Sequence, residues 1–271
     1  MRRLILHVGA PKCGSTFLQR VMLKNRGKLC DLGLNYPHLG PGHPGNGEVI
    51  YEVPEPWLTR QFERAPILML SHELLFAQAA RATRLRHLVE RMDVQVDITA
   101  FLRPFDEIIL GDYSQTLRQN LPAFIETGRA FHGRSFRQFA WARQKDIQPA
   151  DFLAAWQTAL PSARLHLAHH RDIRATLTQL IPATSAMDWT LPAWRANPSL
   201  SRIACEDALA AALSPAGGSK ASITKNPPPF ADERMRAWLR AIFDPQRHAL
   251  IETFGFDVND LSGNAEIAHA A

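Results

Sequence analysis

The sequence has no long apolar run and few cysteines, and each shortage argues against a class of protein. A helix that crosses a membrane needs a run of about 18 apolar residues, and no stretch supplies one. The apolar residues after Met1-Arg2-Arg3 are too few for a signal peptide, so we expect none. The three cysteines (Cys13, Cys30 and Cys205) are far apart, odd in number and without metal-ligand spacing. This usage predicts reduced thiols in a cytoplasmic protein that has no metal site.

Composition and charge are those of an ordinary globular enzyme. Hydrophobic residues make up 46% of the chain and charged residues 21%. A length of 271 residues allows one large domain or two small ones. We expect one domain over residues 1–262 and a disordered tail over residues 263–271. The formal charge of +5 suits an anionic ligand such as a nucleotide or an acidic glycan, although a mildly basic surface explains it equally well.

The most informative stretch is the N-terminal one. Leu4–Val8 is an apolar run of strand length, and Gly9–Thr16 then places two glycines, a lysine and two hydroxyls in a short turn. From Phe17 onward, apolar side chains recur at helical spacing. A glycine-rich turn between a strand and a helix holds phosphate, because backbone N–H groups and the helix N-terminus both face the anion. Ser15 or Thr16 can cap this helix or donate to a phosphate oxygen.

The order of residues in this turn distinguishes between kinds of phosphate site. The nucleoside-triphosphate loop reads G-x-x-x-x-G-K-[ST], with its lysine directly after the second glycine. Here Gly9 and Gly14 fit that pattern, but Ser15 stands at the lysine position and Lys12 lies inside the loop. The segment Gly9-Ala10-Pro11-Lys12-Cys13-Gly14-Ser15-Thr16 resembles, nearly position by position, the 5′-phosphosulfate loop of the sulfotransferase family. Members of that family use 3′-phosphoadenosine 5′-phosphosulfate (PAPS) as sulfate donor.

The resemblance implies that most of this loop binds the donor. The implied binding residues are Gly9, Pro11, Lys12, Cys13, Gly14, Ser15 and Thr16. Cys13 beside a helix N-terminus could be a reactive thiol. Because the family accepts several small residues there, we interpret Cys13 as a packing residue of the loop. The alternative for the whole segment is a glycine turn without a ligand.

Further along the chain, apolar runs of strand length alternate with helical patterns. Candidate strands cover residues 66–70, 94–102 and 164–169, and helical patterns follow them. This alternation predicts an α/β fold with a central parallel sheet flanked by helices. The resemblance specifies a P-loop-like three-layer sandwich of the sulfotransferase type. Ligands bind such sheets beyond the carboxyl ends of the strands, and the polar groups Lys12–Thr16, Ser71–Glu73 and Arg103 all follow strand ends.

The resemblance also implies catalytic roles. Sulfuryl transfer needs a cation at the leaving oxygen and a base for the acceptor's proton. Lys12 is our candidate for the cation. Glu73, in a segment that resembles the S-x-E segment of sulfotransferase-like proteins, is our candidate for the base, unless it only caps the following helix. His72 is the second candidate, since another branch of the family uses histidine, and His43 is a weaker third.

The donor's second phosphate needs its own binding groups. In the family they are an arginine at a strand end and a serine eight residues later. Arg103 fits, but Gly111 stands at the serine position. Ser114, one turn further along the same helix face, is the candidate that replaces it. A surface salt bridge is the alternative role for Arg103.

Together with these residues, the resemblance implies a PAPS-dependent sulfotransferase that needs no metal. The predicted acceptor is a hydroxyl or amine of a glycan or small molecule, and no nucleic-acid partner is expected. The loop over residues 32–55 would line the acceptor pocket or lie in solvent, and Trp189 and Trp194 would stack on a sugar or pack in the core. The rivals are a P-loop nucleotide kinase and a sulfotransferase-like protein that binds nucleotide without catalysis; Gly111 supports the second.

Overall fold

The computed structural model describes residues 1–38, 40, 42–192, 199–214 and 232–261. The chain divides into two compact units. The first contains residues 1–103, 149–193 and 248–271, and the second contains residues 104–148 and 194–247. The predicted single domain over residues 1–262 stays a prediction, and the predicted tail lies outside the described residues. Within the described ranges, no helix has the length and apolarity that a membrane span requires.

The first unit is built on a five-stranded parallel sheet with strand order β2-β3-β1-β4-β5. Its strands are β1 (Arg2–Val8), β2 (Leu34–Asn35), β3 (Ile67–His72), β4 (Val94–Leu102) and β5 (Arg164–His169). This arrangement confirms the predicted α/β class and four of the strands. The short strand β2 was not predicted, because glycine, asparagine and proline around it indicate turns.

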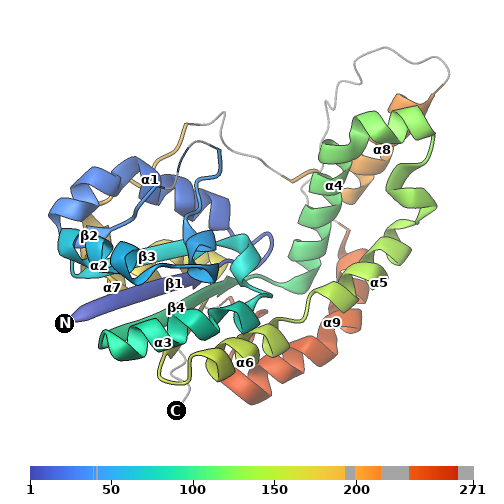
Figure 1. Ribbon diagram of the computed structural model, residues 1–271. Coiled ribbons are helices and arrows are strands. Elements are labelled where there is room, and N and C mark those ends of the chain that lie inside the picture. Colours follow the sequence, from blue (N-terminus) through green and yellow to red (C-terminus); the bar gives the residue numbers. More distant parts are fainter. Residues whose placement is uncertain (39, 41, 193–198, 215–231, 262–271) are drawn as a thin grey trace. The chain divides into compact units, whose positions relative to one another are not determined.

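Helices cover both faces of this sheet. They are α1 (Ser15–Asp31), α2 (Glu55–Arg64), α3 (Thr83–Arg91), α6 (Pro149–Ala159) and α7 (Ile173–Leu180). Figure 1 shows α1 on one side of the strands and α3 and α6 on the other. Burial on both faces explains why β1 is a continuous apolar run rather than an alternating one: Leu4, Ile5 and Leu6 are all fully buried.

Short 3-10 helices connect several of these elements. They are η1 (Gly47–Tyr51), η2 (Glu73–Leu75), η3 (Ala79–Ala82), η5 (His170–Asp172) and η6 (Pro182–Ala186). The buried Trp156 of α6 donates through its indole nitrogen to the carbonyl of Leu75, at 2.9 Å. This bond holds η2, which follows β3, against the second layer of helices.

The second unit is helical. It contains α4 (Phe105–Thr127), η4 (Ala130–Gly133), α5 (Phe136–Asp146), α8 (Arg202–Leu213) and most of α9 (Glu233–Phe254). Its core includes Tyr113, which stacks on Phe131 at 4.2 Å and meets Phe136 and Phe139 edge-on.

The helix ends of this unit follow from sequence. Ser135 is the N-cap of α5, in a capping box completed by Gln138. A serine directly before a helical pattern predicts a cap at Ser201, and Ser201 does cap α8 by accepting from the amide of Ala204. The sequence pattern after residue 230 predicts two separate helices, over residues 231–243 and 246–254, and this prediction is wrong. Helix α9 runs through Pro245 without a break, since a proline removes one backbone donor but does not always end a helix.

Candidate functional site

The loop between β1 and α1 is folded tightly. The amide of Gly9 donates to the carbonyl of His72 at 3.2 Å, so the loop starts against the end of β3. Lys12 and Gly14 have left-handed backbone conformations, with φ of 60° and 87°. A Cβ atom on Gly9 would lie 2.4 Å from Ser15 Oγ, and only glycine allows that close approach. The loop therefore curls back over the first residue of α1.

The first turn of α1 is suited to an anion. Gly14 is the N-cap residue, and no side chain caps the helix, so the predicted capping by Ser15 or Thr16 is wrong. The first turn contains no acidic residue. Ser15 is 3% exposed, and its hydroxyl has no hydrogen-bond partner within the described part of the chain. Uncapped N–H groups, the helix dipole and an unused hydroxyl together fit a phosphate or phosphosulfate oxygen.

Glu73 lies beside this loop. It is the first residue of η2, directly after β3, and it is half-buried. The hydroxyl of Thr16 donates to Glu73 Oε1 at 3.1 Å. A Cβ atom on Gly9 would lie 3.4 Å from Glu73 Cα, so the two backbones are close as well. The sheet thus brings the Glu73 carboxylate, which follows β3, to the loop that follows β1. The sequence predicted both as parts of the site.

The side chain of His72 contacts other residues than Glu73 does. Its Nδ1 accepts from the amide of Leu74 at 3.1 Å, and its Nε2 lies 3.2 Å from Glu48 Oε1. His72, not Glu73, is therefore the residue that caps η2. Burial lowers the pKa of His72. Both ring nitrogens of His72 are therefore engaged by neighbouring groups of the protein.

His43 lies next to His72, with 4.8 Å between ring centroids. It is exposed, and its Nδ1 accepts from the amide of Gly45. The segment that carries it is attached to β3 by Asn46, which sequence reasoning did not single out. Asn46 donates to the carbonyl of Met69 and accepts from the amide of Ser71, at 3.1 and 2.7 Å. Loop residues 43–48 are thereby held at the same sheet edge as Glu73.

Arg103 follows β4 and contacts the loop directly. Its guanidinium donates to the carbonyl of Lys12 at 3.2 Å. The structure therefore brings together Lys12 and Arg103, which are 91 positions apart in sequence.

His170, after β5, is a neighbour of Arg103 that the sequence analysis missed. Burial, and to a smaller extent the charge of Arg103, lowers the pKa of His170 to about 3, so this imidazole stays neutral beside the guanidinium. Its position directly after a predicted strand was the available signal.

Two other predicted residues have partners of their own. Ser114 belongs to α4 in the second unit, is 1% exposed, and accepts from the amide of Leu200 at 2.8 Å. Its predicted contact with the donor stays a prediction. The buried thiol of Cys13 donates to the carbonyl of Pro11 at 3.2 Å, which supports its interpretation as a packing residue.

An aromatic pair lies at the start of α1. The ring of Phe17, which is 40% exposed, stacks on Trp189 with 6.4 Å between centroids. The segment around Trp189 is held to α1 by Lys24, which bonds Asp188 and Thr190. Phe17 thus offers an aromatic surface one residue after the loop. Trp194 lies outside the described residues.

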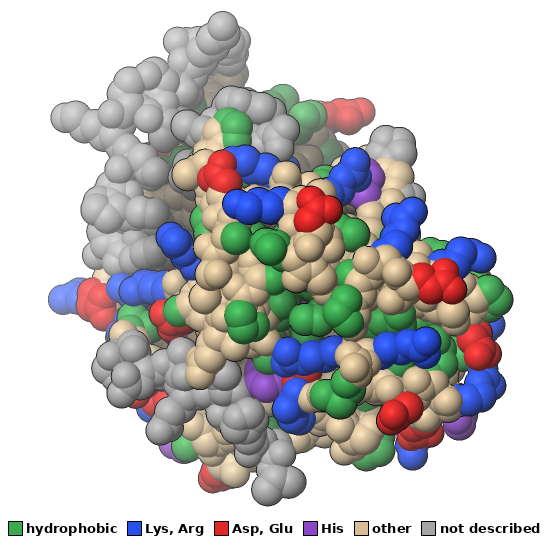
Figure 2. Space-filling model, turned by 90° about the vertical axis from the view of Figure 1, so that its left-hand side faces the viewer, with side chains coloured by type: hydrophobic (Ala, Val, Ile, Leu, Met, Phe, Trp, Pro, Cys, Tyr) green, Lys and Arg blue, Asp and Glu red, His purple; other side chains and the backbone are tan. Residues whose placement is uncertain are grey.

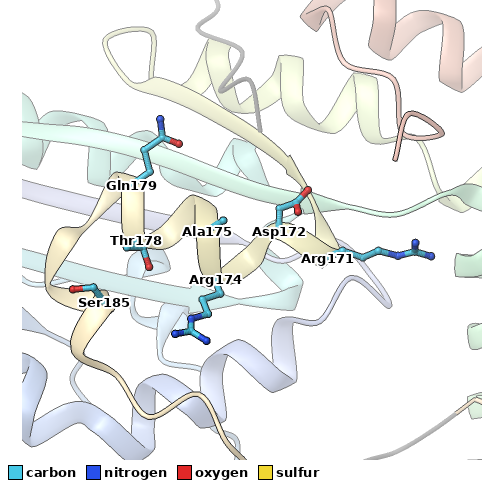
Figure 3. Close-up of a pocket in the computed structure, with 7 residues that line it drawn as sticks. All are labelled: Arg171, Asp172, Arg174, Ala175, Thr178, Gln179 and Ser185. Carbon is cyan, nitrogen blue, oxygen red and sulfur yellow. The ribbon is translucent and has the colours of Figure 1, made fainter. Parts of the chain in front are cut away.

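A surface pocket lies beside α7. It is lined by Arg171, Asp172, Arg174, Ala175, Thr178, Gln179 and Ser185. Figure 3 shows the guanidinium groups of Arg171 and Arg174 pointing in different directions. Among the described side chains, no cluster of three or more histidines, cysteines and carboxylates is arranged to hold a metal ion.

Comparison with known proteins adds a likeness in fold. No protein-family model matches the chain, and no curated protein matches it. Among solved structures, the crystal structure of a sulfotransferase from Alicyclobacillus acidocaldarius is similar, with a TM-score of 0.45 and 14% sequence identity. The alignment covers 95% of this chain and 97% of that one. At this level of similarity we base the function on the residues described above.

Proposed function

We propose that this protein is a sulfotransferase that transfers a sulfuryl group from PAPS to a hydroxyl or amine of a glycan or small molecule. The observation that supports this most directly is the meeting of three strand ends. The loop after β1, Glu73 after β3 and Arg103 after β4 are joined by the Thr16–Glu73 and Arg103–Lys12 hydrogen bonds. Cation, anion-binding turn and carboxylate then lie at the switch point of a parallel sheet, where such folds bind ligands.

Each residue has a defined task in this proposal. PAPS supplies the sulfuryl group and a good leaving phosphate. The amides at the start of α1 and the Ser15 hydroxyl bind its phosphosulfate end, and Lys12 balances the charge that grows on the leaving oxygen. Arg103 binds the 3′-phosphate, with which a guanidinium pairs well. The Phe17 ring offers a stacking surface for the purine.

We assign the base to Glu73 rather than His72. Glu73 accepts one hydrogen bond, from Thr16, which orients its carboxylate at the loop and leaves further lone pairs for an acceptor proton. His72 uses both ring nitrogens for Leu74 and Glu48. The acceptor group would lie between Glu73 and the phosphosulfate end, so that proton removal and attack on sulfur occur in one geometry.

The first test is calorimetric titration with adenosine 3′,5′-bisphosphate, ATP and GTP. We expect the bisphosphate to bind at least about tenfold more tightly than either triphosphate, because in this proposal Lys12 and Arg103 bind two separate phosphates. Lys12→Ala should weaken this binding, whereas Arg84→Ala, which removes an exposed cation of α3, should not. Preferred binding of ATP or GTP would favour the kinase rival.

The second test is an acceptor screen with sulfate-labelled donor. Transfer to a glycan or small molecule that disappears in Lys12→Ala supports catalysis. If the bisphosphate binds but no acceptor is labelled, the non-catalytic rival is favoured.

A further inference from the structure

Helix α5, in the second unit, presents two contrasting faces. Phe136, Phe139 and Ala140 are buried in the core of the unit. Arg137, Trp141 and Lys145 recur at helical spacing on the opposite side, and all three are exposed. Arg134, just before the helix, is exposed as well and extends the same row. We call Arg134, Arg137, Trp141 and Lys145 the α5 basic face.

The charge of this face is of one sign. Its four residues include three cations and no acid, and no ion pair involves those cations within the described residues. The nearest acidic residue along the helix, Asp146, pairs instead with Arg143, which also binds Asp112 on the other side of α5. By contrast, the face of the molecule in Figure 2 has lysines and arginines interspersed with aspartates and glutamates. A row of unneutralised cations is a surface that attracts polyanions.

An exposed tryptophan lies within this row. Trp141 is 50% exposed, although an indole is a large apolar group that proteins seldom leave in water without use. The guanidinium of Arg137 lies over a second indole, Trp238 of α9, at 5.1 Å from the ring centroid. This cation–π contact orients Arg137 within the row and covers part of the Trp238 ring, which is only half-exposed, whereas Trp141 is exposed.

We propose that the α5 basic face binds an acidic polysaccharide, whose carboxylate or sulfate groups pair with Arg134, Arg137 and Lys145. The C–H face of one sugar ring then packs on the indole of Trp141. Arginine forks match carboxylate and sulfate oxygens, and a flat aromatic ring provides an apolar surface for a sugar. A single-stranded nucleic acid fits less well, because such strands stack successive bases on several aromatic rings and this face offers one open ring.

The inference does not rest on the proposed function, because glycan binding to the α5 basic face requires no donor. A failure to bind glycan would leave the binding of adenosine 3′,5′-bisphosphate untouched. The two proposals are therefore tested separately.

The experiment is fluorescence anisotropy with a labelled heparin oligosaccharide and the full-length chain, at about 50 mM and about 200 mM sodium chloride. We expect the Arg134→Ser/Lys145→Ser variant to bind at least about fivefold more weakly at the lower salt and to show a shallower salt dependence. Trp141→Leu should also bind more weakly, while Trp141→Tyr, which keeps an aromatic ring, should retain most of the affinity.

Matched controls separate a site from general electrostatics. Arg60→Ser/Arg84→Ser removes two exposed cations from α2 and α3 and should change binding by less than about twofold. Circular dichroism and thermal unfolding check that every variant is folded. Equal weakening by both double variants, unchanged binding in Trp141→Leu, or no binding at all would overturn the proposal. So would tighter binding of a single-stranded oligonucleotide or of vesicles of anionic lipid.

Discussion

Ser71 Oγ lies 2.7 Å from His7 Nδ1, where β3 and β1 run side by side in register. The same hydroxyl accepts from Gln19 Nε2 at 3.1 Å, and all three side chains are fully buried. Ser71 therefore connects β1, β3 and α1. Because Ser71 and His7 each stand two residues before a site residue, Glu73 and Gly9, this network supports both halves of the proposed site.

Removal of the Ser71 hydroxyl is expected to destabilise the fold. Ser71→Ala leaves buried polar groups of His7 and Gln19 without their partner, and each unsatisfied group costs about 1–3 kcal/mol. We expect the free energy of unfolding, measured in urea, to fall by at least about 1 kcal/mol. Ser185→Ala, which removes an exposed hydroxyl bonded to Pro182, is the control and should change it by less than about 0.5 kcal/mol. Equal effects would show that the buried network is not stabilising.

His7 is expected to make stability depend on pH. Burial lowers the pKa of His7 to about 3, far below the value of about 6.5 for a free histidine. As pH falls below about 6.5 the unfolded chain takes up a proton that folded His7 does not, so stability decreases by up to about 1.4 kcal/mol per pH unit. His7→Asn lacks this group and should show a shallower loss between about pH 6 and about pH 4. Parallel curves for the two proteins in urea unfolding would contradict the assignment.

Asp97 is expected to make stability depend on pH as well, in a more acidic range than His7 does. Burial alone would raise the pKa of Asp97, but bonds from His166 and Arg3 and the charges of Arg3 and Arg164 lower it to about 2. The resulting stabilisation is present above the unfolded pKa of about 3.9 and is lost as pH falls toward about 2.

Asp97→Asn should therefore lower the free energy of unfolding at neutral pH by at least about 3 kcal/mol, because three basic side chains lose a buried partner. The difference from the unmodified protein should shrink by about 2 kcal/mol between pH 5 and pH 2. A constant difference across that range would exclude this role for the carboxylate.

Lys12 is expected to lower the stability of the fold through its backbone conformation, while its ammonium is required for activity. Its φ of 60° is a left-handed conformation that costs a residue with a side chain about 1–2 kcal/mol. Lys12→Ala and Lys12→Gly both remove the ammonium and should both abolish sulfuryl transfer. Lys12→Gly should nevertheless be about 1 kcal/mol more stable than Lys12→Ala, since glycine adopts this conformation without strain. Thermal unfolding of the two variants measures the difference; a less stable glycine variant would contradict it.

Substitution of Glu73 is expected to lower the turnover number and to leave donor binding nearly unchanged. Glu73→Gln keeps the size of the side chain but removes the base, so we expect the turnover number to fall by about 100-fold or more. Binding of adenosine 3′,5′-bisphosphate by calorimetry should change by less than about threefold. His43→Ala is the comparison, because that imidazole is exposed at the same sheet edge. A large loss of turnover in His43→Ala with little loss in Glu73→Gln would move the base to His43.

Several features could be read from the sequence because they depend on neighbouring residues. An apolar run such as Leu4–Val8 predicts a buried strand, and Ser201 before a helical pattern predicts a cap. The position of Lys12 within its loop departs from the triphosphate pattern and predicts, by resemblance, a phosphosulfate site. These signals depend on residues close together in the sequence, so the sequence alone determined the α/β class and the strand-turn-helix at the N-terminus.

Other features were decided by tertiary structure, since they join segments far apart in the chain. Only the parallel pairing of β1 with β3 and β4 brings Glu73 to Thr16 and Arg103 to the carbonyl of Lys12. The choice between Glu73 and His72 depended on contacts of His72 with Glu48, 24 positions earlier in the sequence, which no local pattern encodes. Contacts between residues on different strands require the whole sheet to form, and this is why the sequence indicated the residues of the proposed site but not the hydrogen bonds between them.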